Sequence, residues 1–95
     1  MKDFDPNLFK AKRNEIFEIE IPELDSKIKF GLMTGQDYLS LAEIPSNEQS
    51  YYAIWIMLHK AYPDLTFDDF KSWDLKVLIP IIKHVGDKGD FRAQE

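Results

Sequence analysis

Apolar and polar residues alternate in two short segments near the N-terminus, and this pattern predicts a β-hairpin. Residues 15–21 read EIFEIEI and residues 27–32 read KIKFGL, as in strands with one face toward water. The polar turn 23–26 favours antiparallel pairing, with acids of the first strand opposite lysines of the second. Because an isolated hairpin is only marginally stable, we expect helices to cover its apolar face. That face would consist of Phe17, Ile19, Ile21, Ile28, Phe30 and Leu32.

Residues 51–58, YYAIWIML, carry no charge and predict the middle of a buried central helix. Ser46 is the predicted N-cap of this helix, which would end near Ala61. At about 100° per residue, the apolar side chains form one main stripe, which we expect to bury Trp55 against the hairpin. The main stripe consists of Tyr51, Ile54, Trp55, Leu58 and Tyr62, and a second line beside it consists of Tyr52, Ile56 and His59.

Two further capped segments flank the central helix. Thr34 and Asp37 predict the start of a helix over 35–43. Thr66 predicts a second cap, at the start of a short helical segment within 65–73. The side chains expected to face the core are Tyr38, Leu39, Leu41 and Ala42 from the first segment and Phe67 and Phe70 from the second.

A final helix is predicted to begin at Asp74. Pro80 lies inside it and lacks the backbone N–H that a helix needs, so we expect the helix to kink or split there. Gly86 is the expected residue just after its C-terminus. The expected core stripe consists of Leu75, Leu78, Ile79, Ile82 and Val85.

These elements predict an α+β fold, in which an N-terminal antiparallel β-hairpin packs on a small bundle of three to four helices. The 95 residues are enough for one domain. We divide the chain into a mobile N-terminal arm (1–14), a single globular domain (15–86) and a frayed C-terminal tail (87–95). The arm carries four basic and two acidic residues. In an alternative interpretation, the arm docks on an acidic partner through Phe4, Leu8 and Phe9.

Composition and charge argue against several classes of function. The 12 basic and 17 acidic residues give a net charge of −5, which disfavours nucleic-acid binding. The chain has no cysteine, so disulfides, thiolate nucleophiles and thiolate zinc ligands are excluded. The start, MKDFDPNLF, lacks the apolar core of a signal peptide. A helix that spans a bilayer needs about 20 apolar residues, and no apolar run in the chain is that long. We therefore expect a cytoplasmic protein that does not bind membranes.

No group of residues predicts catalysis, a metal site or a bound cofactor, and we expect that the protein is not an enzyme. His59 and His84 lie beside apolar stripes, where histidines are usually hydrogen-bonded or face solvent. Four aspartates near each other do not fit the spacing of a calcium-binding loop, and capping and solvation explain them better. They are Asp64, Asp68, Asp69 and Asp74. Trp55 and Trp73 are interpreted as core and core-edge residues, although exposed tryptophans are typical interface anchors.

The order of these elements, together with two phrases, resembles a known family. Residues 29–41 read KFGLMTGQDYLSL, and residues 63–78 read PDLTFDDFKSWDLKVL. With the hairpin, they look like the small tail assembly chaperones of long-tailed bacteriophages and related baseplate-hub accessory proteins, over residues 17–85. The chain departs from this family at Gly31-Leu32, where members often have an arginine-proline pair.

The resemblance implies a non-enzymatic assembly factor. Members of this family bind the long, helical tape-measure protein and keep it soluble until tail-tube subunits displace them. Two alternatives stay open. In the first, the protein is a structural tail or baseplate component of the virion instead of a chaperone. In the second, it is a small regulatory adaptor between proteins.

A hairpin and one short helix can hardly cover both apolar lines of the two long helices, so we expect an exposed apolar surface in the monomer. This surface would bind a second copy, which gives a homo-oligomer, or an apolar helix of a partner such as the tape-measure or another tail protein. The predicted partner-binding residues are Tyr52, Ile56, His59, Val77 and Ile81.

Overall fold

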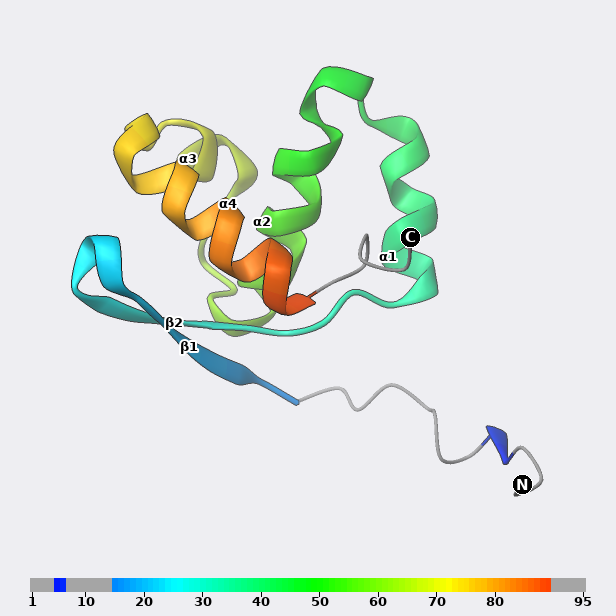
Figure 1. The fold of residues 1–95 in the computed structure, drawn as a ribbon. Helices are drawn as coiled ribbons and strands as arrows, with labels where there is room; N and C mark the ends of the chain where they lie inside the picture. The colour runs from blue at the N-terminus through cyan, green and yellow to red at the C-terminus, as the bar shows by residue number, and fades with distance from the viewer. Residues whose placement is uncertain (1–4, 7–14, 90–95) are drawn as a thin grey trace.

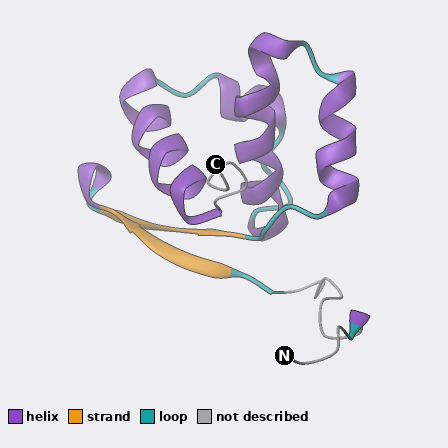
Figure 2. Cartoon of the chain, turned by 45° about the vertical axis from the view of Figure 1, so that its right-hand side comes forward, coloured by secondary structure: helices purple, strands orange, loops and turns teal. Residues whose placement is uncertain are grey.

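The computed structural model describes residues 5–6 and 15–89, and it consists of a two-stranded sheet with helices on one side. Figures 1 and 2 show the helices above the hairpin, so the predicted α+β class is confirmed. The strands are β1 (Phe17–Ile21) and β2 (Ser26–Phe30), joined by the 3₁₀ turn η2 (Pro22–Leu24). The helices are α1 (Gly35–Ser40), α2 (Gln49–Ala61), α3 (Phe67–Lys71) and α4 (Leu75–Gly89), and the 3₁₀ turns η3 (Leu41–Glu43) and η4 (Ser46–Glu48) connect α1 to α2.

The antiparallel register of the hairpin agrees with the alternation in the sequence. Glu18 pairs with Lys29 and Glu20 with Lys27 on the exposed face. Leu32 does not continue the apolar face and is 44% exposed, because β2 ends at Phe30 and the two-residue periodicity ends with it. The face that does turn toward the helices consists of Phe17, Ile19, Ile21, Ile28 and Phe30.

The end of β2 lies directly against α2. The Gly31 N–H donates to the Met57 carbonyl at 2.9 Å, and the Lys29 N–H donates to the Tyr62 hydroxyl at 3.0 Å. A Cβ atom at Gly31 would lie 2.7 Å from Cδ and 3.0 Å from Cβ of Lys60, so glycine allows this close approach without a shift of the Lys60 side chain. Any larger side chain at this position would have to displace Lys60.

The core consists of two apolar clusters that share α2. Ile54 and Leu58 are almost completely buried, as the main stripe of the central helix predicts. The larger cluster consists of Phe30, Ile54, Met57, Leu58, Phe70, Leu78, Ile81 and Val85. The smaller cluster consists of Leu41, Ala53 and Ile56, and it joins the segment after α1 to the opposite side of α2.

The predicted helix caps are confirmed at Thr34 and Thr66 but not at Ser46. The Thr34 hydroxyl accepts from the Asp37 N–H at 3.2 Å, and the Asp37 carboxylate accepts from the Thr34 N–H at 2.9 Å. These two bonds form a capping box, whereas at the start of α3 the Thr66 hydroxyl accepts from the Asp69 N–H at 3.0 Å. Ser46 begins η4 instead, and no side chain caps α2.

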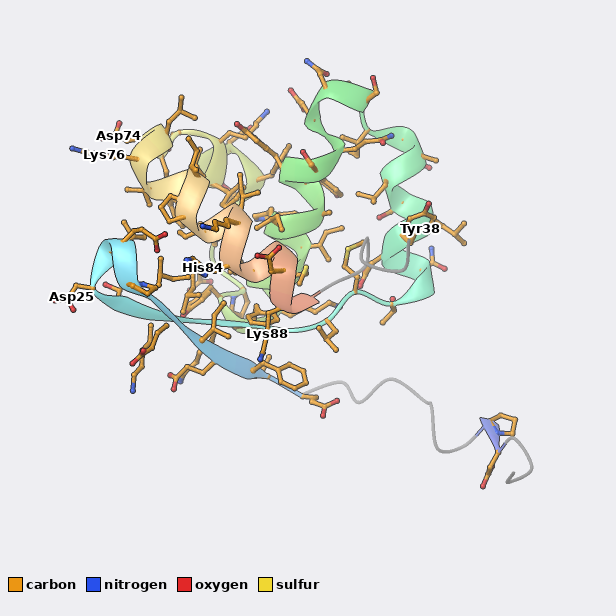
Figure 3. All side chains as sticks on the ribbon, viewed as in Figure 1. Asp25, Tyr38, Asp74, Lys76, His84 and Lys88 are labelled. Carbon is orange, nitrogen blue, oxygen red and sulfur yellow. The ribbon has the colours of Figure 1, made fainter. Side chains whose placement is uncertain are left out.

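The prediction that α1 buries Tyr38 and Leu39 is wrong. These side chains are 63% and 66% exposed, and Tyr38 projects away from the body of the molecule in Figure 3. The helix has six residues, none of them buried, and the chain reaches the core only at Leu41, in η3. Ala42 is also exposed, so Leu41 is the one residue of the predicted set that packs inside.

The buried side of α4 differs from its predicted stripe. Leu75 and Ile79 are each 59% exposed. The buried line consists of Leu78, Ile81 and Val85, and it is rotated by roughly 70° about the helix axis from the predicted one. The reason is that the hairpin packs on the side of α4 that carries Ile81, and no described segment covers Leu75 and Ile79.

The last helix also ends later than predicted, at Gly89. The helix α4 continues through Pro80, so it does not split there. Gly86 is buried within the helix and does not follow its end. Residues 87–89, the first residues of the predicted tail, are helical. The predicted arm, apart from Asp5 and Pro6, and the remainder of the tail lie outside the described residues.

Candidate functional site

An apolar cleft lies between the hairpin and the first half of α4, and its volume is about 310 Å³. A cleft of this size is at the lower end of the range of ligand-binding pockets. Its apolar lining comes from Ile21, Leu24 and Ile28 of the hairpin and from Trp73, Val77 and Ile81 before and within α4. The remaining lining residues, Ser26, Lys27 and Asp74, are exposed and polar.

The hairpin wall depends on a tight turn between the strands. Asp25 has a positive φ of 51°, which an aspartate tolerates, and its N–H donates to the Pro22 carbonyl at 3.1 Å. The Ser26 hydroxyl donates to the Leu24 carbonyl at 3.0 Å and so fixes the start of β2. The turn η2 contacts α4, and this places Leu24 at the wall of the cleft. Figure 3 shows Asp25 at the tip of the hairpin.

The other wall begins at Trp73, just before α4. Its ring packs edge-on against the buried ring of Phe70, with 5.3 Å between the centroids. The Asp74 carbonyl then accepts from the N–H groups of Val77 and Leu78 at 2.9 and 3.0 Å, which starts the helix. Among the described residues, nothing accepts a hydrogen bond from the indole N–H of Trp73.

A hydrogen-bonded pair of side chains ties the hairpin turn to α4 beside the cleft. Nε2 of His84 lies 2.9 Å from Oε1 of Glu23, and Figure 3 shows His84 between α4 and the hairpin. A hydrogen bond to its own backbone N–H lowers the pKa of Glu23, and the hydrogen bond to His84 lowers it further. The ionised carboxylate is thus the favoured form at the point where the turn meets the helix.

Val77 and Ile81 are the predicted partner-binding residues that the structure brings into the cleft. Val77 is half-buried and accessible from the cleft, whereas Ile81 is only 3% exposed and forms part of its floor. The expectation that Ile81 is exposed is therefore wrong, because its side chain belongs to the larger core cluster.

Tyr52 and His59 lie elsewhere, on the side of α2 that faces the chain around α3, and Ile56 packs with Leu41 of the segment after α1. Ile56 is 8% exposed and belongs to the smaller core cluster, so its predicted exposure is also wrong. Tyr52 and His59 are half-buried in an aromatic cluster, which we define as Tyr52, Trp55, His59 and Phe67. Nδ1 of His59 lies 3.0 Å from the Leu65 carbonyl, and this confirms the interpretation of a hydrogen-bonded histidine.

Trp55 belongs to this aromatic cluster and is oriented by it. Its indole N–H donates to the Leu65 carbonyl at 2.9 Å, and its ring stacks on His59 with 4.6 Å between centroids. The ring of Phe67 lies 5.7 Å away. Trp55 therefore faces the segment that leads into α3, and the prediction that it packs against the hairpin is wrong.

Sequence reasoning named Trp73 as a core-edge residue, but it missed the cleft that Trp73 lines and the contribution of the hairpin to it. The alternation in the two strands correctly indicates which side chains turn inward, but it does not show where the helices stop covering them. Leu24 lies in a segment interpreted only as a polar turn. The one signal in the sequence that could have indicated this site is Trp73 itself, because a tryptophan just before a helix can lie at the surface, and exposed tryptophans are typical interface anchors.

No three His, Asp or Glu side chains of the described residues come together in a group that could hold a metal ion. Within the same part of the chain, no helix combines the length and the apolar character needed to cross a bilayer. In comparisons with known proteins, no family model matches the chain, and no curated protein or solved structure shows significant similarity to it.

Proposed function

We propose that the protein is a non-enzymatic binding protein that holds an apolar segment of a larger protein in the cleft. The observation that carries this proposal is the open apolar cleft, with half-buried Trp73 and Val77 on one wall and Leu24 and Ile28 on the other. Side chains that lose their remaining contact with water on binding dominate the affinity of such sites. The volume of about 310 Å³ suits a few side chains of a bound helix, which would lie across the mouth of the cleft.

In its most specific form, the proposal is a tail assembly chaperone that binds the tape-measure protein in the host cell cytoplasm. The resemblance of the sequence supports this form, and the phrase at residues 63–78 includes Trp73, Asp74 and Val77, which line the helical wall of the cleft. A long amphipathic helix of the tape-measure protein offers a stripe of apolar side chains to such a cleft. The net charge of −5 helps to keep the complex soluble.

The test is co-expression with the tape-measure protein from the same genome, followed by isolation of the complex and a binding measurement. We expect a soluble complex with the parent chain. Val77→Ser should weaken binding at least about tenfold, because it removes an apolar anchor from the cleft. Ile79→Ser is the matched control, since Ile79 lies on the same helix and is 59% exposed but does not line the cleft.

Three outcomes would contradict parts of the proposal. If the parent chain forms no complex with the tape-measure protein, it is not a tail assembly chaperone. If Val77→Ser and Ile79→Ser weaken binding equally, the cleft is not the binding site. If the protein remains in purified, finished virions, it is a structural tail or baseplate component, because a chaperone is displaced before the tail is complete.

A further inference from the structure

The two outer edges of the hairpin differ in how their backbone groups are satisfied. The edge of β2 is covered by the end of α2, because Lys29 and Gly31 donate to the Tyr62 hydroxyl and the Met57 carbonyl. The edge of β1 receives no hydrogen bond from any part of the chain that the structure describes. An open strand edge of this kind presents a row of backbone donors and acceptors to another chain.

The register identifies which groups point outward from β1. In an antiparallel pair, opposite residues alternate between exchanging two hydrogen bonds and directing both N–H and C=O away from each other. The Lys29 N–H points away from β1, toward Tyr62, so Glu18, which lies opposite Lys29, directs its own backbone groups outward. The same holds for Glu20, two residues further along the strand. The outer edge of β1 therefore offers two N–H and two C=O groups, at Glu18 and Glu20.

The side chains at this edge select a partner by charge. Glu18 and Glu20 are exposed on the face of the sheet that is turned away from the helices. A strand added beside β1 would place every second side chain next to these carboxylates. On its other side, β1 already has Lys29 and Lys27 opposite them. Lysine or arginine in the added strand gives favourable cross-strand pairs, whereas acidic residues there repel. The alternate residues of the added strand would extend the apolar face of β1.

A second copy of this chain fits the edge poorly. Two β1 strands that pair about a twofold axis through Ile19 would place Glu18 of each copy opposite Glu20 of the other. Both contacts would be between like charges, which destabilise a sheet when they lie directly opposite each other.

We propose that β1 is a docking edge for an extended segment of a partner protein in which lysine or arginine alternates with apolar residues. Main-chain hydrogen bonds at Glu18 and Glu20 provide the affinity, and the two carboxylates provide the selectivity. This inference goes beyond the proposed function and does not depend on it, because neither Glu18 nor Glu20 lines the cleft.

The experiment uses the full chain, labelled for NMR, and three synthetic peptides of about eight residues, a typical strand length. The first peptide alternates lysine with valine, the second alternates glutamate with valine, and the third is the lysine peptide with N-methylated amides along one edge. We expect the lysine peptide to slow amide exchange at Glu18 and Glu20 by at least about tenfold at saturation. The glutamate peptide should bind at least about tenfold more weakly, and the methylated peptide should bind more weakly as well.

Two variants at Glu20 separate the contribution of the backbone N–H to peptide binding from that of the carboxylate charge. Glu20→Pro removes an outward N–H without removing a bond to β2, so it should abolish peptide binding and leave the melting temperature close to that of the parent. Glu20→Gln keeps the backbone edge and should only weaken binding. If Glu20→Pro does not fold, the three peptides and the parent chain still decide the question.

Three results would overturn the proposal. The first is equal affinity for the lysine and glutamate peptides, which would remove the selectivity. The second is unchanged amide exchange at Glu18 and Glu20 while the peptide is bound. The third is protection of these two amides at rising protein concentration without any peptide, which would assign the edge to a second copy of the chain.

Discussion

The two tryptophans lie on two sides of the molecule that differ in how completely they are packed. Trp55 donates to the Leu65 carbonyl, and its ring stacks on His59. Trp73 contacts Phe70 with its ring, lines the cleft, and has no acceptor for its indole N–H among the described residues. An aromatic side chain is therefore held by several contacts where a connecting segment returns across it, and it lines an open cleft where no described segment returns.

The segment between α2 and α3 causes this difference. After α2 ends, the Leu65 N–H donates to the Tyr62 carbonyl, and the chain turns back along the helix. The Leu65 carbonyl then lies near both Trp55 and His59, at 2.9 and 3.0 Å. On its cleft side, the first half of α4 faces only the hairpin among the described residues, so the cleft stays open.

The largest effect on stability should come from truncating Trp55, the tryptophan that the segment around Leu65 covers. Trp55→Ala is expected to lower the free energy of unfolding by about 3 kcal/mol, because it removes most of the aromatic cluster and one hydrogen bond. Trp73→Ala should cost about half as much, since one side of that residue already faces the cleft. Urea denaturation of both variants measures the two values. Equal losses would show that the two sides are packed alike.

Ile56 provides the next comparison, between buried and accessible aliphatic side chains. Ile56→Ser should destabilise the fold by about 2–3 kcal/mol, because Ile56 is 8% exposed within the smaller core cluster. Val77→Ser should cost about 1 kcal/mol, because Val77 is only half-buried at the cleft. Thermal unfolding of both variants, followed by circular dichroism, gives the order. A smaller loss for Ile56→Ser than for Val77→Ser would mean that Ile56 belongs to the surface after all.

The sequence predicted those parts of the fold that depend on local chemistry. The alternation in β1 and β2, the capping box at Thr34 and the cap at Thr66 are interactions between residues close together in the chain. It also predicted correctly that α2 is the centre of the core, because so long an uncharged segment is buried in any arrangement.

The sequence did not determine which faces of the helices are covered. Helical periodicity gives an apolar stripe on α4, but Leu75 and Ile79 are exposed, because the hairpin packs on the neighbouring face. Likewise, the three predicted binding residues on α2 are covered by other segments: His59 lies against the Leu65 carbonyl, Tyr52 packs on Phe67, and Ile56 packs with Leu41. Such coverage depends on contacts between segments far apart in the chain, and a periodic pattern contains no information about them.

The two confirmed caps should differ modestly in their effect on stability. Thr34→Ala is expected to cost about 1–1.5 kcal/mol, because the backbone N–H of Asp37 loses its acceptor. The Asp37 carboxylate still accepts from the backbone N–H of residue 34 and pairs with Lys60 at 2.9 Å. Thr66→Ala should cost about 0.5–1 kcal/mol, since its single capping bond is exposed. Chemical denaturation of the two variants under identical conditions compares the caps directly. A larger loss at Thr66 would contradict this order.

The smallest expected effect concerns the pair of Glu23 and His84 beside the cleft. The pKa of Glu23 is lowered first by its own backbone hydrogen bond and then by the hydrogen bond to His84. His84→Ala should therefore raise the pKa of Glu23 only part of the way to its ordinary value. An NMR titration of the carboxyl group measures this shift. Lys83→Ala is the control, and it should change the pKa less, because Lys83 acts only as a nearby charge.

The same pair sets the direction of the pH dependence on the cleft side. Because the pKa of Glu23 is lower in the folded than in the unfolded chain, its contribution to stability is present above the unfolded pKa. That contribution is lost as the pH falls through the folded pKa of Glu23. Amide exchange in η2 should therefore become faster under acid conditions in the parent chain, and less so in His84→Ala. An equal acceleration in both would mean that the pair does not hold the turn against α4, and that apolar contacts alone define this wall of the cleft.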